Sequence, residues 1–230
     1  MTAPGRSLRF HFDFVSPYAY LAWTQIHALA ARHRCEVEAV PVLFAGLLGA
    51  HGSIGPAELP AKRRHLFTDV VRAARRLGVA FALPPSHPFN PLLALRVASL
   101  PMVAERQRAL IDALYAATWG GGGVPGGQGG VTEEAEVARL GDAVGLDGKA
   151  LVAEAGSAAA KDRVRHRTDE AIAAGVFGVP TMVVDGELFW GLDSFANLEA
   201  FLRGEGAIDA AFKARWDSLP ASATRKLPTR

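Results

Sequence analysis

The chain has 230 residues, of which 50% are hydrophobic and 21% charged, so it can bury a sizeable core and is not disordered as a whole. Its 25 Lys and Arg against 23 Asp and Glu leave a net charge of +2, which argues against binding to a nucleic-acid backbone. A single cysteine, Cys35, excludes an internal disulfide, a thiolate zinc cluster and a CxxC redox pair. Residues 6–13 lack the apolar centre of a signal peptide and no run reaches membrane-spanning length, so we expect a soluble, cytoplasmic protein.

The first part of the chain predicts a strand, a helix and a second strand. Residues 8–15 alternate strictly and read as a strand with one apolar face. Ser16 and Pro17 suit the N-cap and first position of a helix over 18–34, because the serine oxygen can accept an orphan helix N–H and proline has none to lose. Residues 36–43 alternate again, and this order predicts a parallel pair with a right-handed crossover. The apolar face of the first strand comprises Leu8, Phe10, Phe12 and Phe14.

The middle of the chain predicts helices, because strand alternation is largely absent from about residue 45 to 175. Between two of these helices, eight of the eleven residues of Gly120–Gly130 are glycine. We interpret this segment as a mobile loop. A phosphate cradle is the weaker alternative, since no GK[ST] follows. The predicted helices span 58–77, 91–100, 104–119, 133–144, 149–155 and 158–174.

Strand character returns near the end of the chain. Residues 180–185 and 187–190 flank Gly186 and predict a hairpin over an Asp-Gly turn. A closing helix is expected over 193–203, and the tail over 204–230 is expected to be partly disordered. The element order indicates one α/β domain interrupted by a helical insertion.

Two local features suggest chemistry. Ser16 lies where the first strand meets the first helix, at the edge where open α/β sheets bind ligands and where helix N–H groups favour an anion. A purely structural N-cap is the alternative for Ser16. A cis bond between Val179 and Pro180 would turn the Val179 backbone toward the same edge, but X–Pro bonds are mostly trans and the local sequence leaves both states open.

Three separated segments of the chain resemble the 2-hydroxychromene-2-carboxylate isomerase family, which is related to kappa-class glutathione transferases and to the DsbA proteins. The segments are Phe12–Ala22, Val176–Thr181 and Phe189–Asp193, and they follow the family's order. The resemblance implies an α/β fold, a thioredoxin-like domain with an inserted all-helical domain, and a cis Pro180. The expected division has four parts. The first half of the thioredoxin-like domain spans 1–44, the helical insertion 45–160, the second half of the domain 161–205 and the C-terminal tail 206–230.

The resemblance also implies a homodimeric, glutathione-dependent isomerase of aromatic-compound degradation. Ser16 stands where thioredoxin relatives carry a reactive cysteine, so the sulfur belongs to glutathione and Ser16 hydrogen-bonds its thiolate. The thiolate adds to a 2-hydroxychromene-2-carboxylate, the ring opens, a bond rotates and the thiolate leaves. The expected glutathione contacts are Ser16, Ser53, Lys62, Val179, Pro180, Leu192 and Asp193, and the expected substrate contacts are His65, Asn90 and Trp190.

Several alternatives stay open. Ser53 replaces an asparagine of the family and Ser194 an arginine, which favours a non-catalytic binding protein, while a kappa-like glutathione transferase or peroxidase would use the same site on another electrophile. Without the resemblance, Lys62 would belong to a solvated helix face and Asp69 would pair with Arg72. We expect no metal, because the histidines are scattered, and no nucleic-acid or membrane partner.

Overall fold

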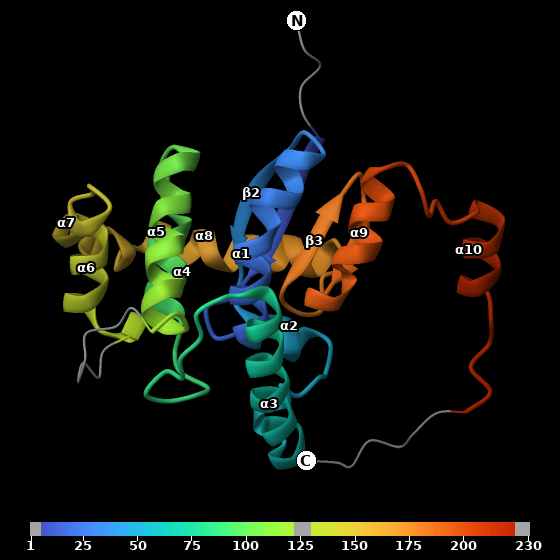
Figure 1. Cartoon of the computed structure of the whole chain (residues 1–230), viewed down its shortest axis with the longest axis horizontal. Helices are drawn as coiled ribbons and strands as arrows, with labels where there is room; N and C mark the ends of the chain where they lie inside the picture. The colour runs from blue at the N-terminus through green and yellow to red at the C-terminus, as the bar shows by residue number, and fades with distance from the viewer. Residues whose placement is uncertain (1–5, 122–129, 224–230) are drawn as a thin grey trace, which may run out of the picture.

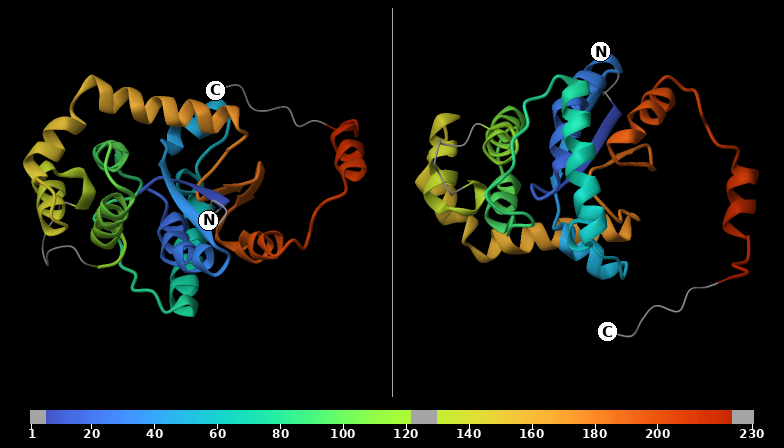
Figure 2. Two further views of the ribbon diagram at one scale, coloured as in Figure 1. Left: turned by 90° about the horizontal axis from the view of Figure 1, so that it is seen from above. Right: turned by 60° about the horizontal axis from the view of Figure 1, so that its bottom comes forward.

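The computed structural model describes residues 6–121 and 130–223. Its centre is a four-stranded sheet of order β2-β1-β3-β4, with helices on both faces (Figure 2). Strands β1 (Arg6–Phe12) and β2 (Cys35–Pro41) are parallel, while β3 (Thr181–Val184) runs antiparallel to β1 and β4 (Glu187–Trp190) antiparallel to β3. The predicted parallel pair and the predicted hairpin are both confirmed.

Strand β1 carries the centre of the core. Its alternating apolar side chains are fully buried on one face, as expected. The opposite face is covered as well, because His11 is only 1% exposed. The strand ends before the predicted residue 15, since the backbone turns and the N–H of Ser16 donates to the carbonyl of Asp13 at 3.1 Å. This turn directs the chain into the first helix.

Helix α1 (Pro17–Arg32) begins as its sequence predicts. The Oγ atom of Ser16 accepts a hydrogen bond from the backbone N–H of Ala19 at 3.2 Å, and Pro17 occupies the first turn. The helix packs on the sheet through buried residues such as Trp23 and Ile26. It thereby forms the crossover between the parallel strands β1 and β2.

The helices of the middle of the chain lie mostly to one side of the sheet (Figure 1). Helix α8 runs from α7 across the sheet, so it crosses the expected boundary at residue 160; the domain division stays a prediction. Most of the glycine-rich segment lies outside the described residues. The helices are α2 (Phe44–Ala50), α3 (Pro60–Leu77), α4 (Leu92–Ser99), α5 (Ala104–Thr118), α6 (Glu134–Ala143), α7 (Gly148–Ala155) and α8 (Ala158–Ala173), with 3-10 turns at Pro56–Glu58 and Gly130–Thr132.

The C-terminal part of the chain returns to the sheet and then leaves it. A 3-10 turn (Leu192–Ser194) precedes α9 (Phe195–Leu202), so the single helix predicted over 193–203 has two parts. Helix α10 (Ala210–Asp217) stands away from the body of the molecule (Figure 1). A contact between Lys213 and Glu187, at 3.0 Å, joins α10 to β4.

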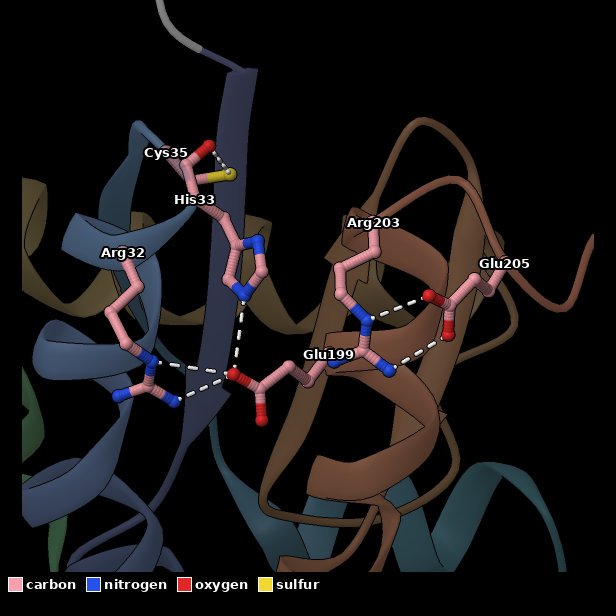
Figure 3. A network of polar contacts seen from close by, with 6 residues as sticks. All are labelled: Arg32, His33, Cys35, Glu199, Arg203 and Glu205. Atoms are coloured by element: carbon pink, nitrogen blue, oxygen red, sulfur yellow. Dashed lines mark hydrogen bonds and ion pairs between the residues drawn. The ribbon is translucent and has the colours of Figure 1, made fainter.

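Helix α9 is attached to the end of α1 by a polar network (Figure 3). The carboxylate of Glu199 accepts a hydrogen bond from Arg32 at 2.8 Å and contacts the ring of His33 at 3.2 Å. Cys35 lies beside this network at the start of β2, with its thiol 3.6 Å from the carbonyl of His33. The cysteine is thus at the opposite end of the sheet from Ser16, about 20 Å away by strand length.

Candidate functional site

A cleft of about 780 Å³ opens where β1 ends and α1 begins. Its walls come from the β1–α1 turn, from α2 and the loop after it, from the first half of α3, from residues 87–89 and Pro91, and from residues 177–179 with Trp190. Segments from both ends of the chain and from the middle therefore meet at one edge of the sheet. This is the edge at which α/β folds commonly bind ligands.

Ser16 lies in this cleft and has two roles for its hydroxyl group. The Oγ atom caps α1, as described above, and the same hydroxyl donates to the carbonyl oxygen of Val179 over a long 3.5 Å. No acidic residue occupies the first turn of α1, although the buried carboxyl group of Asp13 lies just before it. The capping interpretation is confirmed, and the start of α1 lies at the cleft.

The loop before β3 supplies the facing wall. The bond between Val179 and Pro180 is cis, which is the state that the family resemblance implied. Among the described residues, the N–H of Val179 has no hydrogen-bond partner. Pro180 is buried, does not line the cleft, and its carbonyl accepts from the N–H of Gly191 at 2.9 Å. The N–H of Val179 is thus free to pair with a ligand.

An aromatic rim borders the same wall. Trp190 is 52% exposed and its ring lies 5.1 Å from that of Phe177. The indole covers Gly178, since a methyl group there would come within 2.6 Å of Nε1 of Trp190. The glycine is therefore what lets Trp190 lie over the cleft.

Helix α3 contributes cationic and titratable side chains. Lys62 and His65 line the cleft one turn apart, and both are exposed. The neighbouring Arg63 lies over the ring of Phe67 at 5.9 Å, whereas Arg64 is exposed to solvent. Lys62 therefore fits both interpretations of this helix face. It belongs to a solvated face, because its side chain is exposed, and it also lines the cleft.

The other predicted contact residues divide between the cleft and its surroundings. Ser53 lines the cleft from the loop after α2. Asn90 does not line it; its Oδ1 accepts from the N–H of Leu92 at 3.0 Å and so begins α4. Leu192 packs against the main core, and the exposed Asp193 lies beside Gly191. The roles assigned to these residues stay predictions.

A tyrosine–aspartate pair was missed by sequence reasoning. The hydroxyl of Tyr18 donates to Oδ2 of Asp69 at 2.6 Å. The pKa of Tyr18 lies well above its ordinary value. Burial is the largest cause, followed by the hydrogen bond to Asp69 and the charges of Asp69 and Asp193. Asp69 therefore bonds to a cleft residue, and the expected pairing with Arg72 is wrong because the side chain of Asp69 faces α1.

A buried carboxyl group lies behind Ser16. Asp13 is fully buried and accepts backbone hydrogen bonds from Val15 at 3.1 Å and from Phe44 at 2.9 Å. Burial raises the pKa of Asp13 to about 7, although these N–H groups oppose the shift. In the sequence, Asp13 follows Arg9 and His11 in the alternate register to the apolar face of β1 and stands shortly before the predicted helix start. The group ties the start of α2 to the β1–α1 turn.

His87 also lines the cleft. Its Nε2 lies 2.9 Å from the carbonyl oxygen of Val15, and burial lowers the pKa of the ring. The ring packs against Trp119 at 5.5 Å, and the bond to Pro88 is cis. Within residues 6–121 and 130–223 no group of three or more His, Cys, Asp or Glu is placed to hold a metal.

Comparison with known proteins agrees with this architecture. The model of the DSBA-like thioredoxin domain matches residues 7–203, and the chain belongs to that family. It is similar to 2-hydroxychromene-2-carboxylate isomerase of Sphingobium xenophagum, at 31% identity over 199 residues that cover 86% of this chain and 98% of the relative. It is also similar to glutathione S-transferase kappa 2 of Caenorhabditis elegans, at 27% identity over 219 residues, 86% of this chain and 93% of the relative.

The fold is equally well matched. A solved structure of a 2-hydroxychromene-2-carboxylate isomerase has a TM-score of 0.76 to this chain at 25% identity, and the match covers 93% of this chain and 100% of the other. The expected thioredoxin-like fold with added helices is therefore confirmed. The matched family domain ends at residue 203, so α10 lies beyond it. None of the described helices is long and apolar enough to span a membrane.

Proposed function

We propose that this protein is a glutathione-dependent isomerase of the 2-hydroxychromene-2-carboxylate type. The observation that carries the proposal is the position of Ser16 at the start of α1, with its hydroxyl on the Val179 carbonyl and no cysteine in the cleft. The names of the relatives support the reaction class, and the kappa-class relative supports the use of glutathione.

The residues of the cleft fit an extended tripeptide with one thiol, two carboxylates and one ammonium group. The N–H of Val179 can pair with its backbone as an added strand would. Lys62 can receive a carboxylate. At the edge of the cleft, the carboxylates of Asp69 and Asp193 lie near Tyr18, and this negative region suits the ammonium group.

When bound, glutathione supplies the sulfur nucleophile that adds to the substrate and later leaves it. Ser16 stabilises the thiolate by donating its hydroxyl hydrogen, which the long bond to Val179 holds only weakly. The N–H of Ala19 keeps the Oγ atom in place during this exchange. The positive end of α1 acts in the same direction and lowers the thiol pKa.

The rim of the cleft suits an aromatic acid. Trp190 and Phe177 line the cleft with partly exposed rings, and aromatic rings can stack on a flat aromatic substrate. Lys62 and His65 lie on the α3 side and can meet a substrate carboxylate. Asn90 takes part in this proposal only through α4, because its Oδ1 accepts from the N–H of Leu92 at the start of that helix.

The direct test is turnover of 2-hydroxychromene-2-carboxylate with and without glutathione. We expect ring-opened product only with glutathione, and no net loss of glutathione, because the thiolate is regenerated. Absence of product, together with an unchanged Tm in the presence of glutathione, would contradict the proposal. Such a result would leave a protein that binds some other partner through the same fold.

A kappa-like glutathione transferase or peroxidase is the second candidate, favoured by the similarity to a kappa-class enzyme. In this case glutathione is consumed, as a conjugate or as its disulfide. Measuring free thiol during turnover separates the two candidates. The proposal also includes a cytoplasmic homodimer, which light scattering of the purified protein and cell fractionation test.

A further inference from the structure

The face of the sheet turned away from α1 carries several basic residues. Arg9 and His11 are two residues apart in β1, so both project to this face. In β2 they pair with Glu38 and Val40. Helix α8 covers this face (Figure 2), because Val40 packs in one apolar cluster with Ala171 of α8.

Helix α8 adds two arginines to this face. Arg163 and Arg167 are one turn apart, which places their Cβ atoms about 5–6 Å from each other on the same side of the helix. Burial is the largest cause that lowers the pKa of Arg167, and the charges of Arg163, Glu38, Glu170 and Arg9 also act on it. Arg163 and Arg9 are therefore both near Arg167, whose surroundings are partly dry.

Three nitrogen atoms of this region lack hydrogen-bond partners. They are Nη1 of Arg163, Nη1 of Arg167 and Nε2 of His11, all shielded from solvent and unpaired among the described residues. A buried donor without an acceptor costs about 1–3 kcal/mol, and more when it is charged. An acceptor between the two guanidinium groups would remove this cost.

Nearby carboxylates do not supply that acceptor. Glu38 contacts Arg9 at 3.5 Å, Glu170 contacts His166 at 3.2 Å, and Asp162 contacts Arg165 at 2.9 Å. Within the described residues, no ion pair involves Arg163 or Arg167. The two guanidinium groups thus lack a hydrogen-bonded carboxylate, although the charges of Glu38 and Glu170 act on Arg167 from a distance.

We propose that Arg163 and Arg167, with Arg9 beside them, bind a phosphate group on the face of the sheet opposite α1. Two guanidinium forks one turn apart can each donate to a different oxygen of one tetrahedral anion.

This site is separate from the cleft and independent of the proposed isomerase activity. The test is the Tm of the full chain in sodium phosphate against sodium chloride at equal ionic strength. We expect phosphate to raise Tm by about 3 °C or more beyond chloride. The variant Arg163→Gln/Arg167→Gln should lose this extra rise, and its Tm in chloride shows that it folds.

A matched control is available on the same helix. Lys161→Gln/Arg165→Gln removes the same charge from exposed positions of α8 and should keep the phosphate effect. An equal phosphate effect in the Arg163→Gln/Arg167→Gln variant, or no effect in the natural protein, would overturn the site. The conservative variant Arg163→Lys/Arg167→Lys keeps the charge and should weaken binding several-fold, because a lysine cannot present a fork.

A further arm defines the ligand. Glycerol phosphate tests whether the site takes a phosphate monoester. A Tm rise equal to that with inorganic phosphate assigns the site to esters as well, and the absence of a rise restricts it to the free ion.

Discussion

The hydroxyl of Ser16 lies 3.5 Å from the carbonyl oxygen of Val179, which is 163 residues away in the chain. This contact joins the start of α1 to the cis-proline loop and so brings the two halves of the cleft together. A long, weak bond of this kind can be exchanged for a bond to a bound anion at little cost. The predictions below start from this geometry.

Replacing Ser16 with alanine should reduce turnover more than about tenfold, because the thiolate loses its hydrogen-bond donor. Loss of the helix cap costs about 1 kcal/mol in addition. Ser157→Ala is the matched control, since Ser157 caps α8 through the N–H of Ala160 at 3.1 Å and lies outside the cleft. Steady-state kinetics should show normal turnover for Ser157→Ala. Equal turnover in both variants would remove Ser16 from the mechanism.

Asp13→Asn should change how stability depends on pH. Burial raises the pKa of Asp13 from 3.8 to about 7 in the folded protein. Between these values the folded state holds a proton that the unfolded state has lost, so Asp13 favours folding less and less as the pH rises toward 7. The Tm deficit of Asp13→Asn should thus be larger at pH 5 than at pH 8.

Thermal unfolding across this range checks the prediction. Other groups titrate in both proteins, so the difference between the two Tm curves isolates Asp13. Asp217→Asn, on the exposed α10, is the control and should follow the natural protein at each pH. A Tm deficit of Asp13→Asn that is constant with pH would show that the pKa of Asp13 is not raised.

Gly178→Ala should alter substrate binding more than stability. The added methyl group would meet Nε1 of Trp190 at 2.6 Å, and Trp190 is exposed enough to move aside. Loss of its ring from the rim should raise KM severalfold while Tm changes little. Gly49→Ala is the control, since a methyl group there meets nothing within 4 Å. An unchanged KM for Gly178→Ala would exclude Trp190 from substrate binding.

Removing residues 204–230 should leave the Tm and turnover of the protein unchanged. Helix α10 is exposed throughout its length, and its contact with the body is the ion pair of Lys213 with Glu187, an exposed pair of the kind that contributes little. The exposed side chains of Ile208, Phe212 and Trp216 belong to this segment. Differential scanning calorimetry and the isomerase assay test the truncated chain. A lower Tm that depends on protein concentration would show that α10 packs against a second copy.

Local patterns in the sequence determined the main elements. The alternation of Phe10 and Phe12 predicts β1, and the Ser16–Pro17 pair predicts the start of α1, because strand alternation and helix capping are decided by nearest neighbours. The segments that resemble the isomerase family predicted a binding site at the junction of β1 and α1. They also predicted that Val179 belongs to this site and precedes a cis Pro180, whereas the local sequence alone left cis and trans open.

Only the tertiary structure decided how distant residues combine. The pKa of Asp13 is high because β1 ends in the interior, and Asp69 bonds to Tyr18 because α3 packs beside α1. In the same way, Arg163 and Arg167 form a cluster with Arg9 only when α8 crosses the sheet. Burial and long-range contact set these properties, and neither is contained in the local order of residues. The single cysteine, by contrast, already excluded a dithiol mechanism from the sequence alone.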